Sequence, residues 1–344
     1  MDDGATSRRG AESERTGRVE PEGHLLGRHV LAALAGRPRA LSSMWLYDDE
    51  GSRLFRRIMA LPGYYPSTAE RSILEEHAGA ILRAVDAPHL VIADLGAGDA
   101  SKTLLLLRAA ADEGVETIYA PIDVSDGALD SARDAVGVAL PEQRMAPVRA
   151  DYVRGVGRLD AVLPAGGPRA HRLVLMLGSN IGNLEHEAAE QLLRGIRSSL
   201  RAGDHLLIGF DVMKDPARLR AAYDDPEGVT AAFNLNLLAR INRELGGDFD
   251  LTRWRHLATF DPRRPAMESW LLSTDRQTVR VLGKSFEFQA WETIHTEISC
   301  KYRDAHLEAF ARAAGLVEVG RWTDPRRDFV DVLYRVHDGL PGRP

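Results

Sequence analysis

The 344-residue sequence contains a single cysteine, Cys300, and this scarcity excludes several classes of protein. One cysteine cannot form a disulfide within the chain or supply the cysteine ligands of a structural zinc site. Such cysteine usage is typical of proteins kept in a reducing cytosol, so we expect a cytoplasmic protein. The eleven histidines show no ligand-like spacing near acidic residues, and we expect no metal site.

Long apolar runs and an excess of basic charge are also missing. No apolar run reaches the roughly 18 residues that a membrane-spanning helix needs. The N-terminal segment lacks the apolar core of a secretory signal. There are 44 basic and 50 acidic residues, a formal net charge of −6, which does not favour nucleic acid or a membrane as a partner. Only four basic residues are lysines, and we attribute this skew to codon usage: Lys102, Lys214, Lys284 and Lys301.

The remaining composition is that of an ordinary globular chain, long enough for two domains or for one domain with an insertion. Residues 1–23 hold no aromatic residue and almost nothing apolar, so we expect a disordered tail. Folded structure is expected from about His24, where an apolar segment indicates a helix.

From residue 70 the sequence alternates between helical and strand patterns. Strands are expected at 89–98, 116–125, 147–152, 171–180 and 204–212. Helices are expected at 70–85, 101–114, 125–136, 185–200 and 305–315. This alternation predicts an α/β fold whose parallel sheet carries helices on both faces. Two closing strands, 316–324 and 328–336, are expected to form an antiparallel pair at the sheet edge.

The pattern changes between residues 214 and 300. Residues 214–262 look mainly helical, whereas 267–294 alternate with period two, which suggests an antiparallel hairpin. We therefore expect an inserted α+β domain made of residues 24–67 and 214–300. It should pack over the carboxyl ends of the strands of the main domain, residues 68–213 and 301–340, where such sheets bind ligands.

The first candidate binding site is a glycine-rich turn at 94–99, directly after the first buried strand. Glycines there allow a ligand to approach the backbone closely, and Asp123, at the end of the next strand, is placed to hold ribose hydroxyls. The third glycine of the dinucleotide fingerprint is missing, because Ser101 stands in its place. The pattern therefore suits S-adenosylmethionine better than NAD. The alternative is a tight turn that binds nothing.

Two further segments combine small, amide and acidic side chains. Residues 178–183, Gly-Ser-Asn-Ile-Gly-Asn, follow the fourth strand and could bind a polar ligand, or could simply satisfy their own backbone. Glu297 and Ser299 have period-two spacing, so they face the same side of an extended segment. An acid beside a hydroxyl could hold a ring with an N–H donor, such as imidazole. The alternative is a solvated strand end, with Cys300 facing the core.

Taken together, eight ordered segments between Leu41 and Val336 resemble the histidine-specific Nα-methyltransferase family of ergothioneine biosynthesis. They are MWLYDDEGSRLF, LPGYYPSTAER, DLGAGDASKT, APIDVS, LGSNIGN, AAYDDPEGVTAAFN, INRELGGDFD and TEISCKYR. Members transfer methyl groups from S-adenosylmethionine to the α-amine of L-histidine and form hercynine. The resemblance implies a Rossmann-like class I methyltransferase sheet with an inserted substrate-binding domain.

The same resemblance implies roles for individual residues. The cofactor site would comprise Gly96, Lys102, Asp123, Asp151 and Tyr152. The substrate site would comprise Tyr64, Gly178, Asn183, Tyr223, Met267, Glu297 and Ser299. Tyr47, Tyr64 and Gly178 would lie at the reacting amine. Asn180 stands where family members often have threonine. The expected partner is an amino-acid substrate bound by a monomer.

Three other functions fit parts of the sequence. A relative could methylate another amino acid such as tryptophan, but a carboxylate at Glu297 is poorly matched to an indole ring. A dehydrogenase is disfavoured by the missing third glycine. A catalytically silent S-adenosylmethionine-binding regulator is disfavoured by the intact substrate segments. No residue among those named is an obvious general base.

Overall fold

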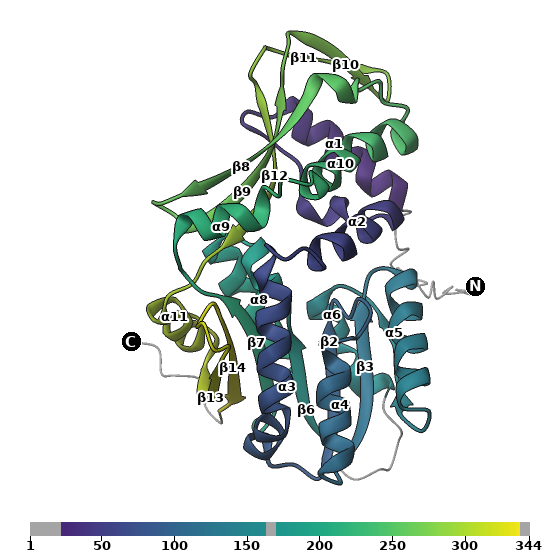
Figure 1. The fold of residues 1–344 in the computed structure, drawn as a ribbon. Helices are drawn as coiled ribbons and strands as arrows, with labels where there is room; N and C mark the ends of the chain where they lie inside the picture. Colours follow the sequence, from purple (N-terminus) through teal and green to yellow (C-terminus); the bar gives the residue numbers. More distant parts are fainter. Residues whose placement is uncertain (1–21, 163–169, 338–344) are drawn as a thin grey trace, which may run out of the picture.

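The computed structural model describes residues 22–162 and 170–337 (Figure 1). The predicted disordered tail, residues 1–23, thus falls mostly outside the described residues. Its last two residues, Glu22 and Gly23, are helical, because α1 spans Glu22–Ala35. Among the described residues, no helix is long and apolar enough to cross a membrane.

A mostly parallel sheet forms the lower part of the molecule in Figure 1. Its strand order is β13-β14-β7-β6-β2-β3-β4, with β5 also paired to β3. The four central strands are parallel: β2 (His89–Leu95), β3 (Glu116–Asp123), β6 (His171–Met176) and β7 (His205–Asp211). β13 (Leu316–Thr323) and β14 (Phe329–Val336) pair antiparallel at one edge, as expected from the sequence. The predicted α/β class is confirmed.

The predicted strand at 147–152 is largely wrong. Within it only Val148–Arg149 form a strand, β5, which pairs with β3, and β4 (Arg144–Met145) lies just before the predicted segment. The Asp151 carboxylate accepts a hydrogen bond from Arg154 N at 2.9 Å and caps helix α6 (Tyr152–Gly157). An acidic N-cap satisfies a free backbone N–H at a helix start, so the chain turns into a helix where the sequence suggested an extended segment.

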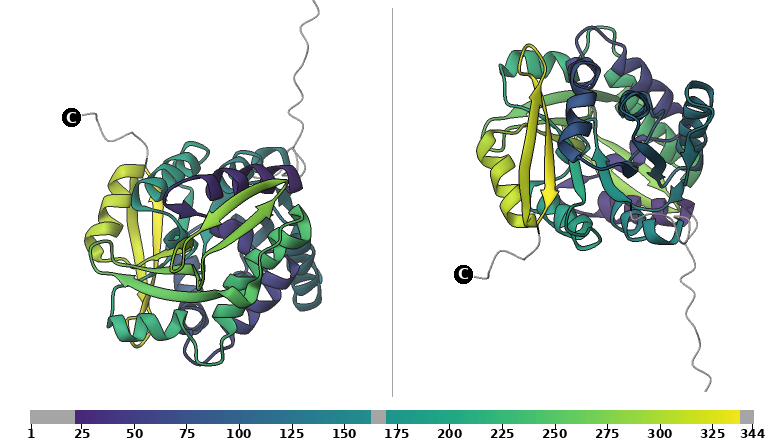
Figure 2. Two further views of the ribbon diagram at one scale, coloured as in Figure 1. Left: turned by 90° about the horizontal axis from the view of Figure 1, so that it is seen from above. Right: turned by 90° about the horizontal axis from the view of Figure 1, so that it is seen from below.

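Helices cover both faces of this sheet (Figure 2). On one face pack α3 (Tyr65–Val85), α4 (Thr103–Asp112) and α5 (Asp126–Ala139). On the other pack α6, α7 (Leu159–Val162), α8 (His186–Ser198) and α11 (Asp304–Ala314). Each face has its own buried cluster of aliphatic side chains, which is why the central strands are apolar along almost their whole length.

The upper part contains a second, four-stranded sheet of order β1-β12-β9-β8. Its strands are β1 (Arg39–Ala40), β12 (Thr293–Cys300), β9 (Ala266–Ser273) and β8 (Trp254–Asp261). β8 lies in the segment predicted to be mainly helical, so that prediction is wrong at its end. The expected hairpin exists as β10 (Gln277–Val281) and β11 (Lys284–Phe288), a separate two-stranded sheet.

Helices from both ends of the upper part share its core. These elements are α1, η1 (Ser43–Leu46), α2 (Asp49–Met59), α10 (Val229–Leu245) and η3 (Leu251–Arg253), whereas α9 (Pro216–Tyr223) packs in a smaller cluster with Tyr65 and Met267. Buried side chains of α1, α2 and α10 pack together with Trp254, Phe288 and Ile294. Segments far apart in sequence therefore form one hydrophobic core.

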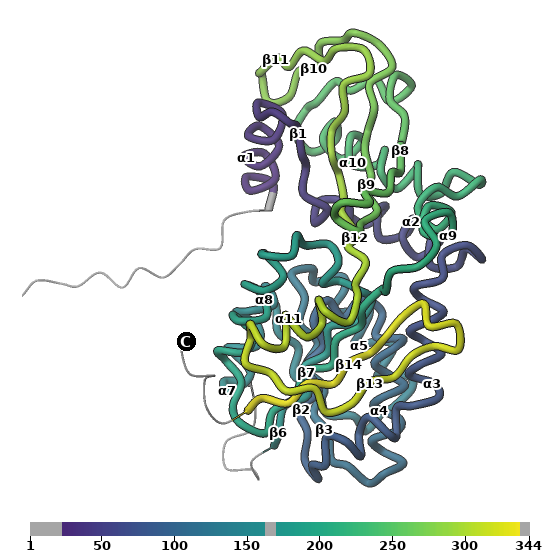
Figure 3. Tube along the Cα trace, turned by 90° about the vertical axis from the view of Figure 1, so that its left-hand side faces the viewer, coloured from purple at the N-terminus to yellow at the C-terminus, as the bar shows by residue number. Residues whose placement is uncertain are grey.

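The two parts meet at the carboxyl ends of the parallel strands, as the side view in Figure 3 shows. The chain leaves β12 and runs directly against the end of β7. Tyr302 N donates to Asp211 O at 2.9 Å, and Met213 N donates to Tyr302 O at 2.8 Å. This junction places the last residues of β12 above the carboxyl ends of the strands of the main sheet.

Candidate active site

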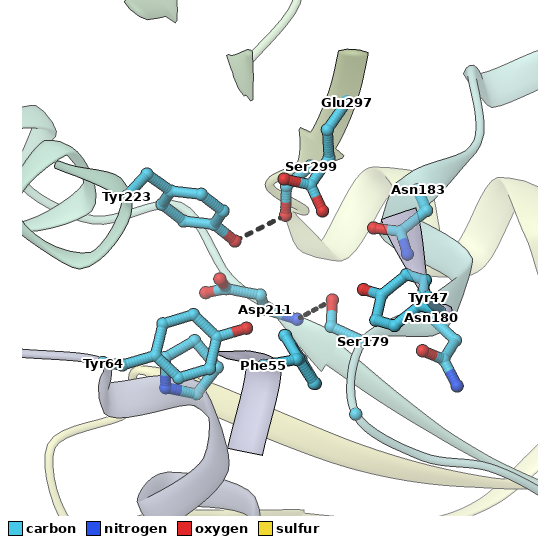
Figure 4. Close-up of a pocket in the computed structure, with 12 residues that line it drawn as sticks. Tyr47, Phe55, Tyr64, Ser179, Asn180, Asn183, Asp211, Tyr223, Glu297 and Ser299 are labelled. Carbon is cyan, nitrogen blue, oxygen red and sulfur yellow. Dashed lines mark hydrogen bonds between the residues drawn. The ribbon is translucent and has the colours of Figure 1, made fainter. Parts of the chain in front are cut away.

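A pocket lies at this junction, and its wall is built from both parts of the molecule (Figure 4). The upper part supplies aromatic and acidic side chains, and the ends of β6 and β7 supply amides, hydroxyls and a carboxylate. The lining residues are Tyr47, Phe55, Tyr64, Pro66, Gly178, Ser179, Asn180, Asn183, Asp211, Tyr223, Glu297 and Ser299. Figure 4 shows polar ends of Tyr64, Tyr47, Asn183 and Glu297 directed toward a common space.

Four aromatic rings form a chain of edge-to-face contacts along one side. The ring centroids of Tyr47 and Phe55 lie 5.4 Å apart, and those of Phe55 and Tyr64 and of Tyr64 and Tyr223 lie 6.2 Å apart. Desolvation within the pocket raises the pKa of Tyr47, Tyr64 and Tyr223 well above the usual tyrosine value, and nearby acids add to the effect. These hydroxyls are therefore neutral at physiological pH.

Glu297 and Ser299 descend from β12 into the same pocket. The hydroxyl of Ser269, on β9, donates to Glu297 Oε2 at 3.3 Å. Desolvation raises the pKa of Glu297 to about 7, against the opposing effects of Ser269 and the Lys301 charge. A carboxyl group that titrates near neutrality can either accept or donate a hydrogen bond to a ligand.

Asp211, the last residue of β7, is fully buried and is the centre of a charged network behind the pocket. The Tyr65 hydroxyl donates to it at 2.8 Å. Lys301 Nζ lies 2.9 Å from Asp211 Oδ2, and Lys214 Nζ is paired with Oδ1. Two lysines and a tyrosine thus compensate the cost of burying this carboxylate.

The glycine-rich turn after β2 fits a bound cofactor. Gly96 has φ +75°, and a Cβ there would lie 2.8 Å from the Tyr152 hydroxyl and 3.3 Å from the Asn180 amide nitrogen. Only glycine leaves this cradle open to a ligand. Asp123, at the end of β3, accepts from Ser125 N at 2.9 Å, and burial raises its pKa. These residues match the chemistry of a ribose-bearing group.

Lys102 and Gly178 are joined by a buried acid, Glu70 of α3. The Gly178 N–H donates to the two Glu70 oxygens at 2.7 and 2.8 Å, and the Lys102 ammonium is paired with Glu70 Oε2. Glu70 itself is fully buried. Since the N–H of Gly178 is used in this way, its carbonyl oxygen is the backbone group that it can offer to a substrate.

The other predicted site residues occupy different surroundings. Asn183 lines the pocket, whereas Met267 is absent from its lining and is buried beneath Tyr223, opposite Ser299 across the β9–β12 pair. The Asp151 side chain is half exposed and caps α6, next to Tyr152.

Sequence reasoning overlooked Asp211, Glu70, Lys214 and Lys301, and named only Lys102 among the lysines as a site residue. Asp211 ends a buried parallel strand, a position that favours binding residues. Lys301 continues the period-two spacing of Glu297 and Ser299. Three of the four lysines, Lys102, Lys214 and Lys301, form ion pairs with buried acids at this junction. Attributing their rarity to codon usage alone missed this clustering.

Comparison with known proteins agrees with this architecture. The pocket and glycine-rich turn define an S-adenosylmethionine-dependent methyltransferase, and residues 26–336 match the family model described as "Histidine-specific methyltransferase, SAM-dependent". The chain belongs to this family.

Relatives in two bacteria and a fungus span most of the chain. It is 40% identical to the histidine N-alpha-methyltransferase of Mycolicibacterium smegmatis, covering 88% of this chain and 92% of that protein. The Mycobacterium tuberculosis protein of the same name is 40% identical, with coverages of 90% and 95%. Ergothioneine biosynthesis protein 1 of Schizosaccharomyces pombe is 30% identical over 84% of this chain and 38% of that protein. The CcbJ methyltransferase of Streptomyces caelestis covers 81% of this chain and 98% of its own, with 18% identity and a TM-score of 0.43.

Proposed function

We propose that this enzyme transfers three methyl groups from S-adenosylmethionine to the α-amine of L-histidine and forms hercynine, the first step of ergothioneine biosynthesis. The observation that carries the proposal is Glu297, an acidic side chain set beside Ser299 in a pocket whose other carboxylate, Asp211, is already paired with two lysines. A ring with N–H groups is the natural complement of that pair.

The substrate is placed by its three functional groups. The imidazole lies against Glu297 and Ser299, and the carboxylate lies against Asn183 and Tyr223. The amine then points toward Tyr47, Tyr64 and the carbonyl oxygen of Gly178. These anchors lie on β12, at the end of α9, just after η1, just before α3 and on the turn after β6, so the wall fixes the orientation of the nitrogen. Alignment of the reacting atoms and exclusion of water are the main demands of this reaction.

S-adenosylmethionine supplies an electrophilic methyl group on its sulfonium. Gly96 and Tyr152 would form the cradle for it, Asp123 would accept from the ribose hydroxyls, and Asp151 would lie beside the base. Lys102 acts through Glu70, which holds the turn at Gly178. The residues 68–213 and 301–340 would form this cofactor-binding domain, and 24–67 and 214–300 the substrate-binding domain.

The tyrosines suit an amine whose charge changes during the reaction. Each of the first two transfers releases one proton from nitrogen, and the third produces a fixed cation. Because their pKa values are raised, Tyr47 and Tyr64 can pass a proton to water but cannot retain a negative charge. Their ring faces can stabilise the final trimethylammonium group.

Two finer points are proposals of the same kind. We propose that the enzyme acts as a monomer, because residues of one chain complete the pocket. We place it in the cytoplasm, because its single cysteine suits a reducing compartment. Tryptophan is a poor alternative substrate, since an indole cannot satisfy the Glu297 carboxyl together with Ser299.

The test is turnover of L-histidine with S-adenosylmethionine, followed by mass spectrometry of the mono-, di- and trimethylated products. Glu297→Ala should lower kcat/KM for histidine by a factor that can approach about 10⁴, because the site then lacks a partner for the ring nitrogen. Its affinity for S-adenosylhomocysteine should stay unchanged. Wild-type protein that leaves histidine unmethylated, or a variant with wild-type preference for histidine, would contradict the proposal.

A further inference from the structure

The hydroxyls of Tyr223 and Ser299 share a single buried cation behind the pocket. Lys301 Nζ lies 2.9 Å from the Tyr223 oxygen and 2.7 Å from the Ser299 oxygen. Its third neighbour is Asp211 Oδ2, at 2.9 Å. The ammonium group thus has three protons and three oxygen neighbours. Lys301 is 1% exposed and does not line the pocket, so it cannot reach a substrate directly.

Counting protons restricts what the two hydroxyls can offer to a ligand. Their oxygen atoms lie 2.7 Å apart, so one hydroxyl donates to the other. Lys301 has no lone pair, so both oxygens must accept from it. Only one hydroxyl proton remains for the pocket. The pair therefore presents one donor and one acceptor to the pocket, on two oxygen atoms that lie 2.7 Å apart.

We propose that Lys301 is a positioning residue that holds the Tyr223 and Ser299 hydroxyls together as one donor and one acceptor, and so sets substrate specificity at both ends. The proposal rests on the function proposed above. A substrate carboxylate has no proton to give, so Tyr223, which faces it, must donate. Ser299 then donates to Tyr223, and its remaining lone pair accepts from an imidazole N–H. The site becomes selective for a ring that has a donor at that place.

Lys214 provides a matched control for this role. It pairs with the same carboxylate, Asp211, and donates to the Tyr65 hydroxyl at 2.8 Å. Within the described part of the chain, its hydrogen bonds go to Tyr65, Asp211 and the Val212 carbonyl, and not to Tyr223 or Ser299. Replacing either lysine by methionine leaves Asp211 with one lysine and Tyr65 as partners, so the two variants remove similar charge from the same network. They differ in whether the two hydroxyls lose their common donor.

The experiment compares wild-type protein, Lys301→Met and Lys214→Met. L-histidine is titrated calorimetrically into each protein saturated with S-adenosylhomocysteine, and steady-state kinetics are measured in parallel. Lys301→Met should weaken histidine binding and raise KM by about 10- to 100-fold, as expected for lost hydrogen bonds from a charged donor. Its kcat and its affinity for S-adenosylhomocysteine should change less than about threefold, because Lys301 touches neither the amine nor the glycine-rich turn. Lys214→Met should change histidine binding less than about threefold.

Equal effects of the two substitutions, or unchanged histidine binding in Lys301→Met, would overturn the proposal. If Lys301→Met fails to bind S-adenosylhomocysteine, Lys301→Gln replaces it, with the same expected rise in KM. Loss of cofactor binding in both Lys301 variants would assign Lys301 to the stability of the fold and would also overturn the proposal. Wild-type protein that does not methylate histidine would instead refute the proposed function, so the two failures are distinguishable.

Discussion

Glu297 and the imidazole of the substrate must share a proton if Ser299 is an acceptor. One ring N–H is then committed to Ser299, and the other ring nitrogen faces Glu297. That contact is a hydrogen bond only when one proton is present, either on the ring or on the carboxyl group. The ordinary pKa of a histidine side chain is about 6.5, close to the value of about 7 to which the pocket raises the pKa of Glu297.

Histidine affinity should therefore be greatest near pH 7 and fall on both sides. Below about pH 6.5 the free imidazole ring and the Glu297 carboxyl of the empty pocket both hold their titratable proton, so one of the two protons must leave on binding. Above the pKa of Glu297, about 7, neither group holds its titratable proton, so one proton must be taken up on binding. Glu297→Gln retains a permanent N–H donor, so the fall on the alkaline side should disappear and only the acidic one remain.

Calorimetric titration of histidine between about pH 5.5 and 8.5, with S-adenosylhomocysteine present, measures both profiles. An affinity of the wild-type protein that keeps rising through pH 8.5 would mean that Glu297 acts only as an ionised acceptor. In that case Ser299 would have to donate to the ring.

On strand β14, Asp331 is a buried carboxyl group whose oxygens have no hydrogen-bond partner among the described residues. It adjoins Glu70, since a Cβ on Gly209 would lie 2.1 Å from Glu70 Oε1 and 3.1 Å from Asp331 Oδ1. Burial, and then the charge of Glu70, raises the pKa of Asp331 well above its usual range. The folded protein therefore holds a proton that the unfolded chain releases above its ordinary pKa of about 4. This contribution favours folding at low pH and is lost as the pH rises.

Asp331→Asn should remove this dependence, because the amide keeps the shape of the side chain without an ionisable proton. We expect the variant to gain thermal stability over the wild type at pH 8, by about 2 °C or more, and to gain less at pH 5. Thermal unfolding at the two pH values is the measurement. Equal changes at both pH values would show that folding does not raise the pKa of Asp331.

The elements that the sequence predicted best are those with buried apolar runs. β2, β6 and β7 are apolar because both faces are covered, and their patterns are unambiguous. β8 was missed because it follows two helices and its exposure alternates only weakly. The third strand was predicted too long because the apolar pattern of one segment does not show that Asp151 is the N-cap of a helix.

The site was predictable where its residues lie close together in sequence. Glu297 and Ser299 are two residues apart on one strand, so their spacing alone indicates a shared face. The partners of Asp211 and Glu70 are brought close only by the fold: Tyr65 is 146 residues from Asp211, and Gly178 is 108 residues from Glu70. No local pattern carries such pairings.

At the scale of the whole molecule, the pocket has two walls that are held very differently. The wall at 299–302 is fixed by long-range backbone bonds: Lys301 N donates to Pro265 O at 2.7 Å, and Tyr302 N donates to Asp211 O at 2.9 Å. The opposite wall, before α3, depends on local turns. Leu61 N donates to Ile58 O and Tyr64 N to Leu61 O, at 2.9 and 3.0 Å.

Amide hydrogen exchange should accordingly be much slower at 299–302 than at 60–64, because opening the first segment requires separation of two sheets. Mass-spectrometric exchange of the unliganded protein measures this contrast directly. Similar rates in the two segments would mean that the junction between β12 and β7 opens as readily as the turns.

The junction between β12 and β7 also determines where the substrate can enter the pocket and where the product can leave it. A histidine that enters and a betaine that leaves must pass a part of the wall that can yield. Since the β12 side is anchored to both sheets, we expect passage beside Tyr47 and Tyr64.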